Sequence, residues 1–466
     1  MPIVVSNGNG VIVGPPLPVV VVSGSLSSDP TLSTPSFVRT NTTFTNDMGP
    51  DGYNWSQGGR RGPIEVDQYG KLIALAEYVN GDHTISYSND LGATWNDGPT
   101  LQFLTRGALA YSSADDRLHV LWVASDPADG VLFRRYTPTR DGSNNITAWA
   151  ATDASYTQFD AQVTGTMEYK HPMILWLNDA AYGAHGALVC AWCCRNTGVG
   201  GTGNEIRAVM RQLSNSAADI VLANWTDIGV NSASTIGNAP LTASYTALLA
   251  NATTGIPHAA LNRLADNNLF VAYHTGTVTG GKMAGAWNYR RATWAAGSNN
   301  WTALQTAQAI CNMVRAGADS GYASKGELVS KIVQDAAGNV GVGIATWKSN
   351  AAGDTWGWAL ISLADAVTLI DTYSASGVHS YAPTGDLEYD SIADRYIASY
   401  VTTIDQFAYL TLYNSTTPTQ ADLLAFNSAP VDIPLTRSRA VPNKLAMLFR
   451  DTATPHLGWF GTLAWN

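Results

Sequence analysis

Charge is scarce in this sequence of 466 residues. Only 13% of the residues are Asp, Glu, Lys or Arg, about half of the ~25% that is usual in soluble domains. The formal net charge is −10, and no basic run occurs anywhere. Because a nucleic-acid surface needs a basic face, this balance excludes a nucleic-acid partner.

Cysteine is equally rare, with four residues at positions 190, 193, 194 and 311. Four cysteines are too few for a disulfide scaffold. Cys190 and Cys193 have the Cys-x-x-Cys spacing of metal and redox sites, but no second such pair and no His-x-x-x-His pair accompanies them. The surrounding run GALVCAWCC (186–194) is typical of a buried strand, so we expect core thiols, no metal and no cofactor.

Long apolar runs are also absent. No stretch approaches the ~20 apolar residues of a membrane span, so we expect no membrane insertion. The first residues, Met1 to Val5, lack a cationic segment, and Pro15, Pro16 and Pro18 interrupt the one apolar run near the N-terminus. This pattern argues against a common secretion signal.

What the chain does contain is a recurring unit, in which a turn of Asp, Asn or Gly precedes an apolar strand. The clearest copies are DQYGKLIALAEY (67–78), SADDRLHVLWV (113–123), LADNNLFVAYH (264–274), DAAGNVGVGIATW (335–347) and SIADRYIASYV (391–401). A second strand and a further turn follow most copies. The repeat predicts an all-β chain folded as a single β-propeller of seven blades, with six as the alternative count.

Two local patterns fit this repeat. Asn-x-Thr triplets recur at Asn145, Asn224 and Asn300 after the second strand of a unit, so we interpret them as repeat register and not as glycosylation sites. The stretch Glu205 to Leu213 has helical apolar spacing, but its place in the repeat predicts a strand.

The first 36 residues differ in composition from the rest. Val and Ile runs broken by Gly and Pro cannot form a core alone, so we predict an extended N-terminal arm at 1–36 and a propeller at 37–466. Residues 37–45 are candidates to close the last blade. The arm suits docking on another chain of an assembly, with a homo-oligomer as one form of it.

One octapeptide, Ser88 to Trp95 (SNDLGATW), stands out. A strand pattern leads into it, Asp90 and Gly92 supply turn chemistry, and Thr94 and Trp95 begin the next strand. With Ser88, these positions resemble the Asp-box of sialidases and related β-propellers, a motif that lies in turns away from the ligand face.

A second match, SNAAGDTW at 349–356, keeps Ser349, Gly353, Thr355 and Trp356 at the same offsets and has Ala351 in place of the aspartate. Two matches suggest that one supersecondary unit was duplicated. We therefore expect Trp95 and Trp356 to be buried at equivalent places in different blades.

The resemblance to sialidases extends to Arg61-Gly62-Pro63 and the strand that follows, which have the spacing of that family's Arg-Ile-Pro motif. It implies that Arg61 binds a substrate carboxylate, and that Asp82 lies where the family has its acid/base aspartate. The rest of the family's catalytic set has no motif that aligns. By blade position alone, the further candidates are Arg207, Arg263, Arg291, Arg439, Glu168, Glu205 and Tyr381.

Two functions from different classes remain. The catalytic set is incomplete, so the first is a non-enzymatic structural or receptor-binding component on the exterior of a tailed-phage particle, held to other virion proteins by its arm. Its many Trp and Tyr side chains suit weak binding of host-surface glycans. The alternative is a sialidase-like exo-glycoside hydrolase, and an extracellular location is the alternative to the virion.

Overall fold

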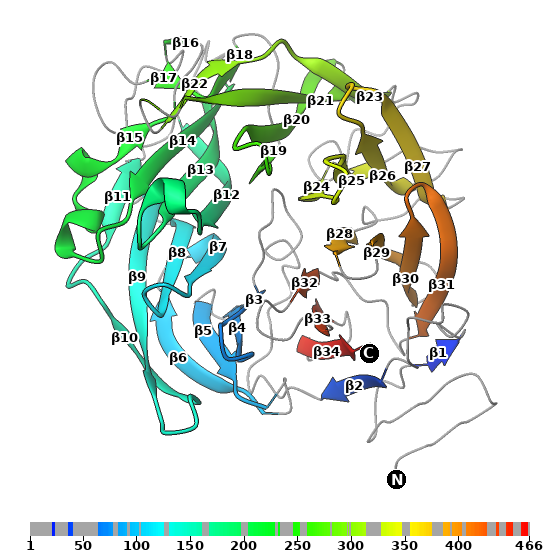
Figure 1. Ribbon diagram of the computed structural model, residues 1–466. Coiled ribbons are helices and arrows are strands. Elements are labelled where there is room, and N and C mark those ends of the chain that lie inside the picture. The colour runs from blue at the N-terminus through cyan, green and yellow to red at the C-terminus, as the bar shows by residue number, and fades with distance from the viewer. Residues whose placement is uncertain are drawn as a thin grey trace.

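Strands dominate the computed structural model (Figure 1), which confirms the all-β prediction. No α-helix, and so no membrane-spanning one, occurs among the residues that the structure describes. These residues are 21–23, 36–40, 64–77, 83–90, 94–101, 104–124, 130–160, 167–196, 204–228, 232–233, 246–251, 259–279, 282–295, 297, 300–313, 328–346, 355–374, 385–391, 394–402, 407–425, 435–437, 444–450 and 458–464. Three short 3-10 segments are η2 (Ala180–Tyr182), η3 (Ala217–Ile220) and η4 (Leu222–Asn224).

The described strands form seven sheets of four or five antiparallel strands and one small sheet. The first sheet contains β3 (Ile64–Val66), β4 (Leu72–Glu77), β5 (His83–Ser88) and β6 (Asn96–Leu101). The second contains β7 (Leu104–Ser112), β8 (Arg117–Ala124), β9 (Val131–Arg140), β10 (Ile146–Ala151) and β11 (Thr157–Asp160). The third contains β12 (Met167–Leu177), β13 (Ala187–Asn196), β14 (Asn204–Gln212), β15 (Thr226–Asp227) and β18 (Leu249–Asn251).

The remaining sheets continue in chain order after the small pair β16 (Ser232–Ala233) and β17 (Thr246–Ala247). The fourth contains β19 (Ala259–Arg263), β20 (Leu269–Thr279), β21 (Lys282–Ala295), β22 (Asn300–Leu304) and β23 (Gln308–Met313). The fifth contains β24 (Leu328–Gln334), β25 (Val340–Thr346), β26 (Thr355–Ile361) and β27 (Val367–Ser374). The sixth contains β28 (Gly385–Asp390), β29 (Arg395–Thr402), β30 (Phe407–Asn414) and β31 (Thr417–Ala425), and the seventh contains β32 (Leu435–Arg437), β33 (Lys444–Arg450) and β34 (Gly458–Ala464).

The sheets stand around a common axis as the blades of one propeller (Figure 1). The first strand of each blade is innermost, and each of these strands contacts the innermost strand of the next blade. Contact between β3 and β32 joins the first blade to the seventh. The prediction of a single β-propeller is therefore confirmed. The strand predicted at Glu205 to Leu213 is β14 and is confirmed as well.

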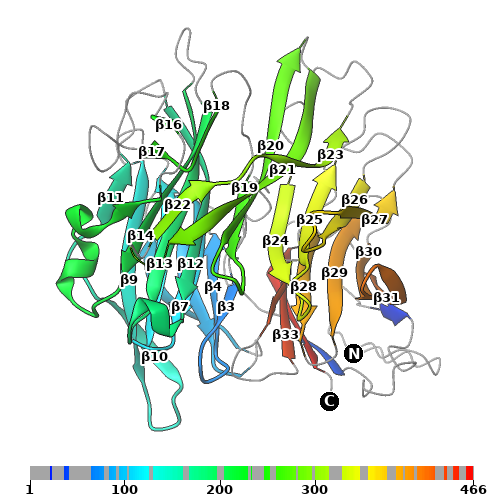
Figure 2. The same cartoon turned by 45° about the horizontal axis from the view of Figure 1, so that its top comes forward.

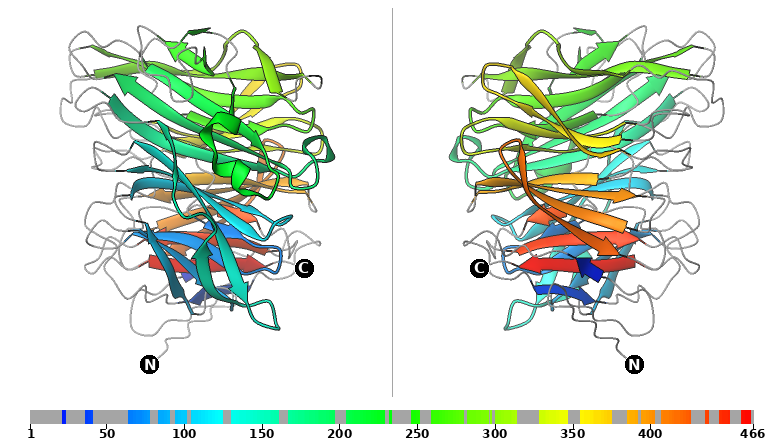
Figure 3. Two further views of the ribbon diagram at one scale, coloured as in Figure 1. Left: turned by 90° about the vertical axis from the view of Figure 1, so that its left-hand side faces the viewer. Right: turned by 90° about the vertical axis from the view of Figure 1, so that its right-hand side faces the viewer.

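Two N-terminal strands add to the last blades. β1 (Val21–Ser23) pairs with β31, and β2 (Ser36–Thr40) pairs with β34, both antiparallel and within the same chain. The side views in Figure 3 show both strands, in dark blue, beside the orange and red strands of these blades. The rest of the predicted arm at 1–36 lies outside the described residues.

The core lies between neighbouring blades because side chains alternate across each strand. Along β8, Leu118, Val120 and Trp122 pack in the cluster toward the first blade. Leu121 and Val123 belong to the cluster toward the third blade. Both faces of a middle strand are thus buried, which is why these strands are almost continuously apolar in sequence. Cys190, Cys193 and Cys194 are buried, and burial raises the pKa of the Cys190 thiol well above its usual range.

The turn that begins at Ser88 is organised by one carboxylate. Asp90 accepts hydrogen bonds from the Ser88 hydroxyl at 2.8 Å, the Thr94 amide at 2.8 Å and the Thr94 hydroxyl at 2.7 Å. These bonds lower the pKa of Asp90 against the raising effect of its partial burial. Gly92 lies outside the described residues. Trp95 is half-buried, so the prediction that it is buried is wrong.

The second octapeptide does not repeat this turn. The first joins the third and fourth strands of its blade, β5 and β6, whereas the second joins the second and third strands of the fifth blade, β25 and β26. Ser349 and Gly353 lie outside the described residues, and Thr355 and Trp356 begin β26. The predicted equivalence of Trp95 and Trp356 is wrong, because similar turn residues here serve two different connections.

The Asn-x-Thr triplets do mark register. Asn145 precedes β10, Asn224 precedes β15, and Asn300 begins β22, so each lies where the third strand of its blade leads into the fourth. This part of the repeat prediction is confirmed.

Polar joints between blades recur where the first strand of a blade turns into the second, an end of the propeller that we call the turn end. There, an aspartate of one blade accepts from a side chain of the next blade. The pairs are Asp67 with Arg140 (2.8 Å), Asp115 with His185 (2.5 Å), Asp179 with Arg263 (2.5 Å) and Asp335 with Tyr396 (2.9 Å). These joints fix the rotation of the four pairs of blades that they connect.

Arg140 makes the most complete joint. Its guanidinium spans Asp116 and Asp67, and Asp67 is fully buried. We expect Arg140→Met to destabilise the fold by about 3–5 kcal/mol, because it leaves a buried carboxylate without its cation. Urea denaturation measures the loss. In Arg140→Met/Asp67→Asn the cost should fall below the sum of the single costs, and strict additivity would contradict a coupled joint.

Candidate functional site

The two residues predicted from the family resemblance, Arg61 and Asp82, lie outside the described residues. Arg61 precedes β3 in sequence, and Asp82 belongs to the connection between β4 and β5. The pairing of β3 with β4 and of β4 with β5 places the start of β3 and the end of β4 at one end of the blade, opposite the turn end. We call this end of the propeller the open end.

Of the arginines proposed by blade position, Arg207, Arg263 and Arg291 are already engaged. Arg207 donates to Asp160 at 2.6 Å and to Glu205 at 3.1 Å, and all three side chains are buried. Trp192 also donates its indole N–H to Asp160 at 3.0 Å. Glu205 is thereby held in a buried ion pair, which assigns it and Arg207 a structural role between the second and third blades.

Arg263 and Arg291 likewise serve joints between blades. Arg263 pairs with Asp179 of the third blade, and Arg291 pairs with Asp365 of the fifth. Of the remaining candidates, Glu168 lies on β12, while Tyr381 and Arg439 lie outside the described residues. The candidates whose side chains are described do not lie together as a substrate-binding triad.

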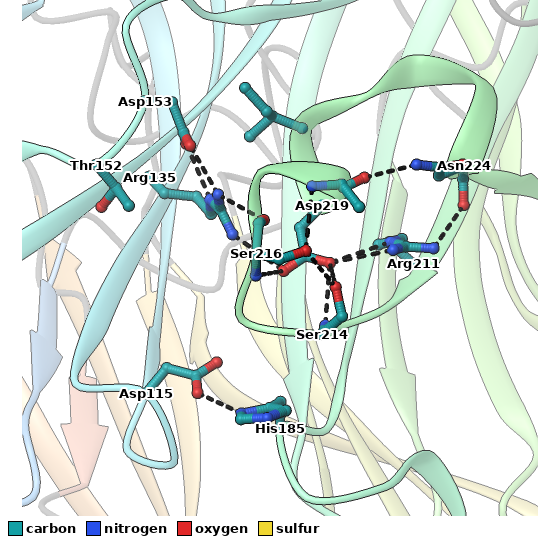
Figure 4. A network of polar contacts seen from close by, with 12 residues as sticks. Asp115, Arg135, Thr152, Asp153, His185, Arg211, Ser214, Ser216, Asp219 and Asn224 are labelled. Carbon is teal, nitrogen blue, oxygen red and sulfur yellow. Dashed lines mark hydrogen bonds and ion pairs between the residues drawn. The ribbon is translucent and has the colours of Figure 1, made fainter.

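A denser polar network joins the second and third blades at the turn end (Figure 4). Arg135, on β9, binds both oxygens of Asp153 at 2.9 and 2.6 Å and reaches Asp219 at 3.0 Å. Asp219 also accepts from the Ser214 hydroxyl at 2.8 Å and pairs with Arg211 at 3.2 Å. These bonds lower the pKa of Asp219 against the raising effect of burial, so a charged carboxylate holds the loop after β14 onto β9.

Beside this network lies an aspartate–histidine pair (Figure 4). Nδ1 of His185 is 2.5 Å from Oδ1 of Asp115, whose side chain is 1% exposed, while the His185 side chain is 35% exposed. Gly186 follows at φ +73, where a Cβ would come within 2.3 Å of the Leu177 carbonyl oxygen, so only glycine fits. The pair holds an imidazole in a fixed orientation at the rim of the interface.

Several buried polar atoms in this region have no hydrogen-bond partner among the residues that the structure describes. They are Oγ of Ser112, Oδ2 of Asp115, Nε and Nη1 of Arg117, and both ring nitrogens of His119. Burial, followed by the charges of Arg135 and Arg117, lowers the pKa of His119 to about 3. Polar side-chain atoms of Arg117, His119 and Ser112 thus lie in this interface without a hydrogen-bond partner in the described part of the chain.

A difference between two copies of the repeat in the sequence indicates this cluster. The repeats SADDRLHVLWV and SIADRYIASYV align so that Arg117 matches Arg395, whereas the residue just after the preceding tyrosine is Ser112 in one copy and Asp390 in the other. A missing carboxylate opposite a retained arginine is visible only when copies of the repeat are compared.

No family model matches this chain, and no curated protein matches it. Solved structures do match. The polysaccharide lyase Uly1 is 12% identical, with a TM-score of 0.51 over 89% of this chain and 92% of that one. An α-L-arabinanase of Penicillium chrysogenum (14% identical, TM-score 0.42, 84% and 98% covered) and an α-L-arabinofuranosidase of Fusarium graminearum (9%, 0.42, 93% and 98%) are also similar. At such identities the likeness to the lyase shows a shared fold.

These comparisons correct the functional expectation. The structure that shares the fold, Uly1, is a polysaccharide lyase, so the predicted structural or receptor-binding role on a virus particle is wrong. The preference for a non-enzyme is corrected with it. That preference depended on the missing sialidase motifs. Their absence argues against one enzyme family, but a propeller of another family can still be an enzyme.

The buried histidine predicts a pH effect. Since the pKa of His119 is about 3 in the folded chain and ~6.5 when unfolded, its contribution to stability is complete above pH ~6.5 and declines as the pH falls toward 3. His119→Leu should remove this contribution, which amounts to at most about 1.4 kcal/mol per pH unit. Urea denaturation from pH 4 to 8 would show it, and parallel profiles for the two proteins would contradict a neutral His119.

Proposed function

We propose that this protein is a carbohydrate-active enzyme that cleaves a polysaccharide at the open end of the propeller. The supporting observation is the likeness to the polysaccharide lyase Uly1, which extends over nearly all of both chains. The proposal concerns the class of reaction, breakage of a glycosidic linkage, by elimination or by hydrolysis.

A comparison of the two ends of the propeller favours the open end as the catalytic site. At the turn end, charged side chains are already engaged in the joints between four pairs of neighbouring blades. At the open end, the hairpin of β20 and β21 extends beyond the neighbouring strands, and β16 and β18 lie at the same end (Figure 2). Additional chain at this end provides material for a substrate surface without disturbing the blade packing.

Arg61 and Asp82 are the residues that we assign to this site, through the resemblance of the first blade to sialidases. A guanidinium binds a substrate carboxylate by two parallel hydrogen bonds. An aspartic acid can transfer a proton to the leaving oxygen or take one from an attacking group. An acidic polysaccharide would use both roles.

Incubation with a panel of acidic and neutral polysaccharides tests this function. Release of reducing ends reports either reaction, and the ultraviolet absorbance of an unsaturated uronate reports elimination alone. We expect activity on at least one acidic polymer, falling by roughly 10²–10⁴-fold in Asp82→Asn and in Arg61→Ala.

The matched control is Arg134→Ala, which removes a positive charge from β9 that donates to the backbone carbonyls of Asp153 and Ala154 and lies over the Tyr136 ring. It should retain activity. Wild-type rates in the Arg61 and Asp82 variants would contradict these assignments, and no release of reducing ends from any polymer would contradict the proposed function.

A further inference from the structure

The second and sixth blades contain the same turn. In the second blade, the Tyr111 hydroxyl donates to Asp116 at 2.5 Å, and in the sixth blade the Tyr389 hydroxyl donates to Asp394 at the same distance. Both aspartates have φ +50, which is uncommon for a residue other than glycine. The identical geometry establishes which residues of the two blades correspond.

One charge differs between the two copies. In the sixth blade, Arg395 is paired across the strands with Asp390 and donates to it at 3.3 Å, both side chains being buried. In the second blade, Arg117 is paired in the same register with Ser112. The arginine is kept, and its carboxylate is replaced by a hydroxyl.

The consequence is a guanidinium with two nitrogens that lack a hydrogen-bond acceptor, although the charges of Asp115, Asp153 and Asp219 act on it. Nε and Nη1 of Arg117 and Oγ of Ser112 have no partner within the described part of the chain. Asp153 and Asp219 nearby are already bound by Arg135. Oδ1 of Asp115 is bound by His185, and its Oδ2 makes no hydrogen bond to Arg117. Buried N–H groups of a cation without acceptors cost considerable stability, so this position calls for an oxygen acceptor from outside the chain.

We propose that Arg117 is the anchor of a binding site for an oxyanion, the carboxylate or sulfate group of an acidic saccharide. The ligand oxygens take the place that Asp390 occupies beside Arg395 in the sixth blade. His185 lies beside the site, and because Nδ1 is bound to Asp115, its Nε2 is the atom that faces a sugar hydroxyl. The site lies at the turn end and is separate from the open end that carries the proposed catalytic residues.

Ser112→Asp provides the most direct test, because it supplies inside the chain the carboxylate that the ligand would bring. The probes are trigalacturonate, its methyl ester, which has no charge, and inorganic sulfate at the same ionic strength. By calorimetry on the full chain we expect the wild type to bind trigalacturonate at least roughly tenfold more tightly than the ester. Ser112→Asp should lose this binding and should melt at a higher temperature without ligand.

Ser112→Asn is the matched control, since it has a similar shape without the charge, and it should keep the binding. Arg117→Gln should lose it whether or not Ser112→Asp folds. Binding of sulfate with no binding of trigalacturonate would assign the site to sulfated saccharides.

Absence of binding by both anions, or undiminished binding in Ser112→Asp and Arg117→Gln, would overturn the proposal and would leave water or Asp115 as the partner of Arg117. The readout is binding and not turnover. Loss of the proposed enzyme activity therefore does not decide this result.

Discussion

Every blade of this protein is buried on both faces, and this constraint governs the rest of the structure. A middle strand such as β8 contributes apolar side chains to the cluster on each side, so a single blade cannot fold alone. Only a closed ring gives each sheet two partners. Contact between the innermost strands β3 and β32 closes that ring.

Apolar packing between sheets is tolerant of small rotations, and the polar joints at the turn end remove that freedom. Each described joint pairs a carboxylate of one blade with a donor of the next, as for Asp67 with Arg140. A buried pair of this kind contributes little net stability, but a misplaced blade would leave a charge buried and unpaired. The joints therefore specify the arrangement more than they strengthen it.

An internal ion pair of this kind can become a binding site when its carboxylate is replaced. The sixth blade pairs Arg395 with Asp390, while the second blade retains Arg117 opposite Ser112. Removing one carboxylate from an internal ion pair leaves a preorganised arginine whose surroundings are already rigid. Function in a repeat protein can thus be sought where one copy lacks a partner that another copy has. The proposed enzymatic function rests instead on the likeness to the lyase Uly1, because a propeller fold can belong to a binding protein or to an enzyme.

The sequence by itself determined the local structure. Turn residues followed by apolar strands predicted the all-β propeller, and the run around Cys190 predicted a buried strand, because these features depend on neighbours close in the chain. The turn around Asp90 was predictable for the same reason. The tertiary structure alone decided which charges meet. The partners in the joints are 61 to 84 residues apart, so they come together only after the blades are stacked in order. Stacking also separated the two octapeptides into different connections, and it left Arg117 without the carboxylate that its counterpart has.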